Sequence, residues 1–209
     1  MDSENKISEN IKSCIVLCGG QSKRMGQDKG SMTIQGKPMI KHVLSTLNHQ
    51  MNEVVIVLND ENRVGQYSEF ISQDDYDYRL TFVEDEIKNR GPLSGIMTGL
   101  AHISGEWALV LPCDSPYVSP DYIKSIFCEI DDDYSAIVPC HDEKNRLMTS
   151  EPLHSVYRKT LIGEIEGLIE KDVLHIKGLI EKIDTKFVLI DNKKIEKKEF
   201  RNLNSPEDI

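Results

Sequence analysis

The stretch that decides the fold is CIVLCGGQSKRMGQDKG, residues 14–30, in which an apolar run ends at two consecutive glycines. The apolar run predicts a buried strand over residues 13–18. Glycines directly after it predict a turn in which the backbone can approach a ligand closely. The basic residues Lys23, Arg24 and Lys29 follow within the same stretch. This combination indicates a pocket for a small anion such as a phosphate group.

The chain as a whole is negatively charged, in contrast to this basic stretch. Its 209 residues include 25 Lys and Arg and 35 Asp and Glu, so the net charge is −10. Sequence-independent binding of nucleic acid requires a broad basic face, so this class of function is not expected. Between Gln21 and Lys41, however, five residues are basic and only Asp28 is acidic. A solvated surface turn is the alternative to a phosphate site there.

Cysteine usage and hydropathy narrow the class of protein further. The five cysteines are odd in number and form no CxxC pair, so neither a disulfide framework nor a structural zinc site is expected. No run of 18 apolar residues exists, so no transmembrane span is expected. Residues 1–12 form a polar, partly acidic extension unlike a signal or transit peptide, and a cytoplasmic location is expected.

Short apolar runs alternate with helical patterns along the chain. Buried strands are expected at 13–18, 54–58, 80–83, 107–112, 135–139, 151–157 and 186–190. Helices are expected within 37–50, 91–103 and 119–130, with two more within 158–182. This alternation predicts βαβ crossovers and a single-domain α/β fold, with three α/β/α layers and a mostly parallel sheet. Residues 191–200 are expected to form an exposed turn that leads into a short strand.

The glycine turn fits neither of two familiar phosphate-binding patterns. The Walker A pattern fails because Gly26 is followed by Gln27-Asp28-Lys29, and the dinucleotide fingerprint G-x-G-x-x-G fails as well. Ligands of open parallel sheets bind beyond the carboxyl ends of the strands, which is where this turn is expected. There Arg24 and Lys29 are suited to neutralise a triphosphate and the charge that develops on its leaving group.

Over nearly its whole length the chain resembles the molybdenum cofactor guanylyltransferases, a family within the nucleotidyltransferases. Leu17-Cys18-Gly19-Gly20 is similar to the family's L-A-G-G signature, with Cys18 in place of alanine. The remaining matches are Arg24-Met25-Gly26, Asp28-Lys29, Gly36-Lys37-Pro38, VED ending at Asp85, GPLSG at 91–95, GEWALVLPCDSPYVSPD at 105–121, PLHSVYR at 152–158 and NLNSPED at 202–208. In the last segment Ser205 stands where the family has threonine.

The resemblance implies a Rossmann-like nucleotidyltransferase fold and a specific reaction. GMP would pass from GTP to molybdopterin, giving the guanine dinucleotide cofactor and pyrophosphate, with Mg²⁺ as cofactor. Residues 13–115 would bind the nucleotide and residues 116–209 the acceptor, with other proteins of molybdenum cofactor biosynthesis as partners and neither nucleic acid nor membrane involved. Because the attacking phosphate monoester is already charged at neutral pH, positioning and charge stabilisation would suffice without a protein base.

The resemblance also implies roles for individual residues. Catalytic roles fall on Arg24, Lys29 and Asp114. The expected GTP-binding residues are Leu17, Cys18, Gly19, Gly20, Lys29, Asn59, Asp85, Gly91 and Asp114. Asp114 is the expected Mg²⁺ ligand, with Asn204 as a second candidate, because a carboxylate just after a strand can hold Mg²⁺ on phosphates. A helix-cap or turn role is the alternative for Asp114.

Several alternatives stay open at this stage. Asn59 and Asp85 carry oxygens suited to the N1–H and N2–H₂ groups of guanine, but each could instead contact the ribose or cap a loop. Family members often have N-x-N after the second strand, whereas Val57 occupies the first of these positions here. GPLSG could serve close helix–sheet packing instead of nucleotide binding. The rival functions are cytidylyl transfer to molybdopterin, activation of a sugar phosphate or lipid-precursor phosphate, and non-catalytic nucleotide binding.

Overall fold

A computed structural model describes residues 11–19, 29–88, 90–190 and 197–203 of the chain. The strands are β1 (Ser13–Cys18), β2 (Thr33–Ile34), β3 (Lys37–Pro38), β4 (Glu53–Leu58), β5 (Arg79–Glu84), β6 (Trp107–Pro112), β7 (Ala136–Cys140), β8 (Val156–Arg158) and β9 (Thr185–Leu189). The α-helices are α2 (Met39–Leu47), α3 (Glu61–Phe70), α4 (Pro92–His102), α5 (Pro120–Cys128), α6 (Ile162–Glu170) and α7 (Ile176–Ile180). Five 3-10 helices complete the described elements, namely η1 (Lys29–Ser31), η2 (Gln73–Asp75), η3 (Pro152–His154), η4 (Lys159–Leu161) and η5 (Lys197–Phe200).

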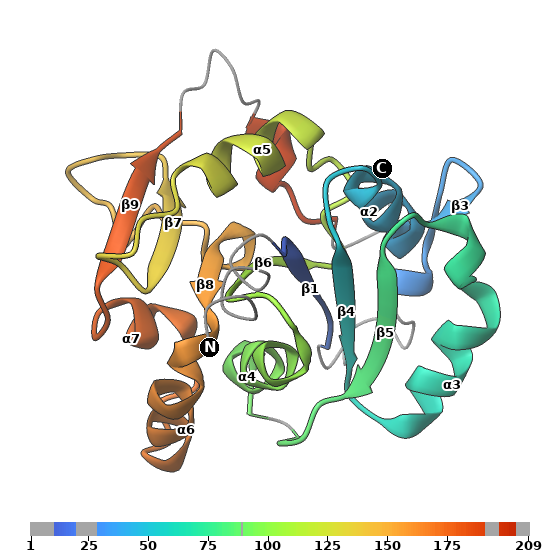
Figure 1. The fold of residues 1–209 in the computed structure, drawn as a ribbon, viewed down its shortest axis with the longest axis horizontal. Coiled ribbons are helices and arrows are strands. Elements are labelled where there is room, and N and C mark those ends of the chain that lie inside the picture. Colours follow the sequence, from blue (N-terminus) through green and yellow to red (C-terminus); the bar gives the residue numbers. More distant parts are fainter. Residues whose placement is uncertain (1–10, 20–28, 89, 191–196, 204–209) are drawn as a thin grey trace, which may run out of the picture.

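A seven-stranded sheet in the order β5-β4-β1-β6-β8-β7-β9 forms the centre of the molecule (Figure 1). Strand β1 pairs in parallel with β4 on one side and with β6 on the other. Strand β8 pairs antiparallel with both of its neighbours, β6 and β7. Strands β1, β4, β5 and β6 therefore end at the same edge of the sheet, together with β7 and β9.

Alternation along the strands produces two core layers. In β1, Cys14 and Val16 face one layer, and Ile15 and Leu17 face the other. The first layer is closed by apolar side chains of α2, α3 and α5, and the second by those of α4, α6 and α7. Because the strands are apolar on both faces, they read as continuous hydrophobic runs in the sequence. The predicted mostly parallel α/β/α architecture is thereby confirmed.

The expected elements are largely confirmed, with three differences. Residues 151–157 do not form one strand, because η3 occupies 152–154 and β8 begins only at Val156. The prediction of a strand near the end of 191–200 is wrong within the described part, since 197–200 form the 3-10 helix η5, whose Phe200 is buried. Helix α3 was missed because of its ten residues only Tyr67 is buried, which leaves a weak apolar pattern.

Helices α3 and α5 both begin with a side-chain cap. Ser119 Oγ accepts a hydrogen bond from Tyr122 N at 3.1 Å, and Pro120 occupies the first turn of α5. Asp60 caps α3 in the same way, accepting from Arg63 N at 3.0 Å. Each cap satisfies an amide that the helix itself leaves unpaired.

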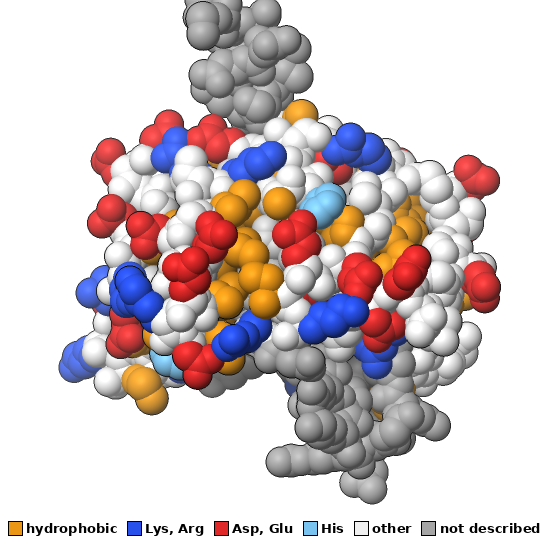
Figure 2. All heavy atoms as spheres, turned by 90° about the horizontal axis from the view of Figure 1, so that it is seen from below, with side chains coloured by type: hydrophobic (Ala, Val, Ile, Leu, Met, Phe, Trp, Pro, Cys, Tyr) orange, Lys and Arg blue, Asp and Glu red, His pale blue; other side chains and the backbone are white. Residues whose placement is uncertain are grey.

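Charges of both signs are interspersed on the surface that Figure 2 presents, with hydrophobic side chains gathered near its middle. None of the helices in the described ranges has the length and apolar character needed to cross a membrane. All five cysteines are free thiols, of which Cys128 alone is exposed.

Candidate active site

Four of the expected site residues lie at one edge of the sheet. Gly19 follows β1, Asn59 follows β4, Asp85 follows β5, and Asp114 lies two residues beyond β6. These strands are parallel neighbours, so their carboxyl ends converge on one region, which is where open α/β sheets bind ligands. The predictions for Gly20, Arg24 and Asn204 fall outside the described residues, and Lys29 is described only through its backbone in η1.

Gly19 and Asn59 are in direct contact across the ends of β1 and β4. A Cβ built on Gly19 would lie 2.5 Å from Asn59 Oδ1, closer than real Cβ atoms approach. Next to them, Arg63 Nη1 donates a hydrogen bond to Cys18 O at 3.3 Å. Helix α3 therefore helps to fix the last peptide before the glycine turn. The sequence reasoning missed Arg63 because it missed α3.

Asp85 accepts three hydrogen bonds, two of them from side chains of α4. Its Oδ2 accepts from Ser94 Oγ at 2.8 Å, and its Oδ1 accepts from Thr98 Oγ1 at 3.1 Å and Ile87 N at 3.3 Å. Burial raises the pKa of the Asp85 carboxyl group, against the opposing effect of these bonds. A carboxylate has about four acceptor positions. Within the described structure the remaining position is on Oδ2, which suits a single contact with a nucleotide.

Gly91 is a residue that the backbone requires to be glycine. It is the N-cap of α4 with φ of 74°, a region that side-chain-bearing residues rarely adopt. A Cβ there would also lie 3.0 Å from Leu174 O. Gly95, one turn further on, lies close to Leu17, because a Cβ at this position would be 3.0 Å from Leu17 Cδ2. The GPLSG segment thus provides close helix–sheet packing and directs the N-terminus of α4 toward the same edge as Asp85.

Asp114 lies in a turn that the C-terminal segment reinforces. Asp114 O accepts a hydrogen bond from Leu203 N at 2.9 Å, and Ser115 Oγ donates to Asn202 Oδ1 at 2.6 Å. The side chain of Ser119, not Asp114, caps the following helix α5. The helix-cap alternative for Asp114 is therefore wrong, and Asn202 lies beside this turn.

The donor chemistry of this edge fits Mg²⁺. Mg²⁺ is usually held by one or two carboxylates plus substrate phosphates, not by a complete cage of protein ligands. In the part of the chain that the structure describes, no three His, Cys, Asp or Glu side chains cluster as a cage would require. The Asp114 carboxylate, together with the phosphates of a bound nucleotide, would supply donors of the kind that Mg²⁺ takes.

Two basic residues near the glycine turn have partners elsewhere. Lys37 Nζ donates to Ser45 Oγ of α2 at 2.6 Å, and Lys41 Nζ lies 3.8 Å from Asp75 Oδ2. Both side chains therefore contact helices, Lys37 at α2 and Lys41 at η2. Among the five basic residues of 21–41, this leaves Lys23, Arg24 and Lys29 as the candidates for binding phosphate.

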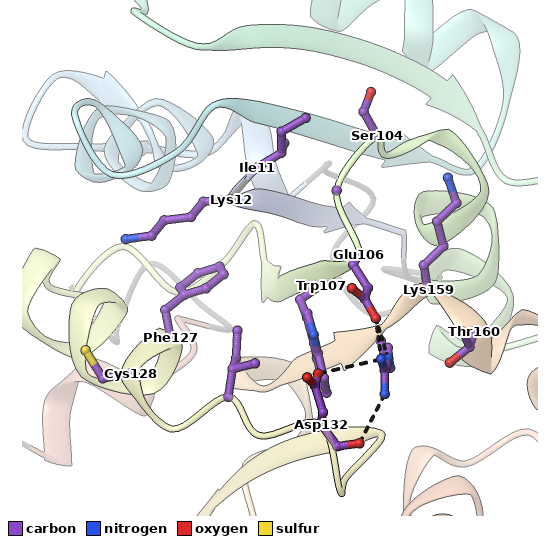
Figure 3. Close-up of a pocket in the computed structure, with 13 residues that line it drawn as sticks. Ile11, Lys12, Ser104, Glu106, Trp107, Phe127, Cys128, Asp132, Lys159 and Thr160 are labelled. Atoms are coloured by element: carbon purple, nitrogen blue, oxygen red, sulfur yellow. Dashed lines mark hydrogen bonds and ion pairs between the residues drawn. The ribbon is translucent and has the colours of Figure 1, made fainter. Parts of the chain in front are cut away.

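A wide cleft of about 960 Å³ lies at the opposite edge of the sheet, near the starts of β1 and β6 (Figure 3). Its charged groups pair with one another: Arg158 donates to Glu106 Oε1 and to Asp132 O. Lys159 Nζ donates to Ile103 O at 2.6 Å, and Lys12 lies over the ring of Phe127. Since these cations have partners within the protein, the cleft is poorly suited to a triphosphate.

Comparisons with known proteins identify the family of the chain. Residues 14–185 match the family described as MobA-like NTP transferase domain. A probable molybdenum cofactor guanylyltransferase of Methanothermobacter thermautotrophicus is 36% identical over 202 residues, which cover 95% of this chain and 98% of that one. A molybdenum cofactor guanylyltransferase of Aliivibrio salmonicida is 32% identical over 196 residues, covering 93% and 92% of the two chains.

The fold has a similar relative among solved structures. The crystal structure of molybdopterin-guanine dinucleotide biosynthesis protein A from Archaeoglobus fulgidus superimposes with a TM-score of 0.75 at 26% identity, covering 95% of this chain and 94% of that one. A nucleotidyl transferase from Methanothermobacter, at 18% identity and a TM-score of 0.70, shares the fold. The family match and the sequence relatives together show that this chain belongs to the MobA-like NTP transferases.

Proposed function

We propose that this chain transfers GMP from GTP to molybdopterin, producing the guanine dinucleotide form of the cofactor and pyrophosphate. A phosphate oxygen of the acceptor attacks the α-phosphorus of GTP, a new P–O–P link forms, and the bond to the pyrophosphate oxygen breaks. The observation that carries the proposal is the convergence of Gly19, Asn59, Asp85 and Asp114 at one sheet edge, in a chain whose relatives are named guanylyltransferases.

Each part of the edge has a role in this proposal. The glycine turn at 19–20, with Arg24 and Lys29, binds the triphosphate and stabilises charge on the departing pyrophosphate. Asp114 holds Mg²⁺, with Asn204 as a second ligand, and the ion when bound neutralises charge on the phosphates. Asn59 and Asp85 contact the nucleoside, while Leu17, Cys18 and Gly91 shape the backbone around it. Residues 116–209 supply the acceptor side.

A pyrophosphate-release assay tests the proposal. The purified chain is incubated with molybdopterin, Mg²⁺ and each of the four nucleoside triphosphates in turn. We expect release with GTP well above the other three, and release that requires both molybdopterin and Mg²⁺. A preference for CTP would replace guanylyl transfer by cytidylyl transfer, and release that does not depend on molybdopterin would require another acceptor.

A further inference from the structure

We propose that His154 is a positioning residue for the reaction, acting through Ser115 and Asn202 on the turn that carries Asp114. The inference rests on the function proposed above. His154 ends η3 and is 1% exposed, while its Nε2 lies 3.0 Å from Ser115 Oγ. A buried imidazole is costly unless it is hydrogen-bonded, so this contact determines how the ring lies.

The hydrogen bonds around Ser115 fix the proton on His154. A hydroxyl group has one proton, and Ser115 Oγ donates it to Asn202 Oδ1 at 2.6 Å. Ser115 Oγ must then accept from His154, so Nε2 of the ring carries the proton and Nδ1 does not. No partner for the buried Nδ1 exists among the described residues. Burial lowers the pKa of His154 to about 3, so the ring stays neutral at physiological pH.

The result is a chain of hydrogen bonds with a fixed direction, from His154 to Ser115 to Asn202. Its members lie 39 and 87 residues apart in sequence and come from separate segments. Ser115 directly follows Asp114, and Leu203, which directly follows Asn202, donates its amide to Asp114 O at 2.9 Å. Two hydrogen bonds, Ser115 Oγ to Asn202 Oδ1 and Leu203 N to Asp114 O, therefore join residues 114–115 to residues 202–203. His154 orients the first of them, because it donates to Ser115 Oγ.

The position of His154 itself is set by contacts that do not use its ring nitrogens. Tyr122 Oη donates to the backbone oxygen of His154, and the imidazole packs edge-on against Phe200 at a centroid distance of 5.3 Å. A substitution that removes only the Nε2–H donor therefore leaves the backbone anchor in place. An effect of His154 on the position of the Asp114 turn can therefore be distinguished from its contribution to core packing.

The test compares His154→Leu, which removes the donor, with His154→Gln, whose amide can place an N–H near the position of Nε2. In full-length protein with GTP and no acceptor, Mn²⁺ binding is measured by electron paramagnetic resonance. Turnover is then titrated with Mg²⁺. We expect His154→Leu to weaken Mn²⁺ binding and raise the half-saturating Mg²⁺ concentration about tenfold, and His154→Gln to restore most of the loss. In a Ser115→Ala background, His154→Leu should add little, because contacting residues in one network are not additive.

The matched control is Tyr157→Phe, which removes a nearby buried donor that bonds Pro152 O at 2.8 Å. It should lower the melting temperature while leaving the Mg²⁺ dependence unchanged. If an active wild-type enzyme and the His154→Leu variant have the same metal dependence, or if His154→Leu and Tyr157→Phe shift it equally, the role of His154 is overturned and the proposed function stands. A wild-type chain without metal-dependent GTP turnover would instead overturn the proposed function.

Discussion

The side-chain oxygen of Asn59 lies over the α-carbon of Gly19, so closely that a Cβ on Gly19 would be 2.5 Å from it. We expect Gly19→Ala to push the Asn59 side chain aside at a cost near or below the lower end of the roughly 1–3 kcal/mol of core overpacking, because the obstructing atom ends a flexible, partly exposed side chain. Asn59→Gly should remove the obstacle, so the double variant should be more stable than the sum of the single effects predicts. Urea unfolding of the four proteins measures this coupling. Strict additivity would show that the two residues do not press on each other.

Asp85 should give stability an unusual pH dependence. Because burial raises its pKa, the folded state holds the proton more tightly than the unfolded chain. The contribution of Asp85 is therefore fully present below the ordinary aspartate pKa of about 4 and is lost as the pH rises through the raised value. Relative to Asp85→Asn, the wild type should lose stability as the pH increases from about 4 to 7.

A control with the opposite sign is available for this experiment. Hydrogen bonds from Asn145 and Lys144 lower the pKa of the partly exposed Asp142 carboxyl group. Relative to Asp142→Asn, the wild type should therefore lose stability as the pH falls. The test is to measure denaturation midpoints across the acid range for the wild type and the two Asn variants. If the wild type changed in stability with pH in the same direction relative to both variants, the assignment of Asp85 would be contradicted.

The free acceptor position on Asp85 Oδ2 predicts discrimination by the base. If it accepts the exocyclic amino group of guanine, GTP should bind more tightly than ITP, which lacks that group. Asp85→Asn should reduce this preference by roughly tenfold, since a hydrogen bond to a charged group contributes about 1.5–3 kcal/mol. Calorimetry with both nucleotides tests this. An equal loss for GTP and ITP would assign Asp85 to the ribose.

Lys29 and Lys37 should differ sharply in their effect on turnover. Lys29 follows the glycine turn, whereas Lys37 lies in β3, just before α2, and its Nζ donates to Ser45 Oγ at 2.6 Å. Lys29→Ala should lower kcat roughly 10²–10³-fold, the typical cost of losing one preorganised donor to a developing charge. Lys37→Ala should stay close to wild type. Equal losses in steady-state assays would contradict the proposed placement of the turn.

Asp114→Asn should separate binding from chemistry. An amide is a much poorer Mg²⁺ ligand than a carboxylate, so product formation should largely disappear. Asparagine keeps the shape of aspartate and part of its hydrogen-bonding capacity, and the backbone bond from Leu203 N to Asp114 O does not depend on the side chain, so the melting temperature should change little. Near-normal turnover at saturating Mg²⁺, measured together with GTP affinity, would remove Asp114 from the mechanism.

The sequence predicts the nucleotide half of the fold well because β1, β4 and β6 are buried on both faces. Runs such as 13–18 and 107–112 therefore appear as continuous apolar segments, and βαβ crossovers follow from their alternation with helices. The direction of β8 could not be predicted, since a strand of three residues has the same pattern in either direction. Helix α3 lacks the apolar stripe that identifies a helix from periodicity.

The candidate site was predictable only where its residues follow strands. Asn59, Asp85 and Asp114 could be placed at one edge because parallel strands end together. The link from Ser115 to His154 and Asn202 depends on tertiary contacts that no local pattern encodes. A partial signal existed, since His154 lies within the mostly apolar segment PLHSVY, residues 152–157, and Ser115 lies within the CDSP motif.

The reversed direction of β8 has a consequence for how such an enzyme changes its acceptor. Because β7 leaves the sheet at the ligand edge and β8 enters from that same edge, residues 141–155 form a loop that begins and ends there. Its first part, residues 141–149, holds no buried residue and can vary in length and sequence while the flanking strands keep their pairing and His154 keeps its place. In the proposed enzyme, this loop segment can be exchanged between relatives. We expect such an exchange to change which acceptor is used and to leave the nucleotide preference unchanged.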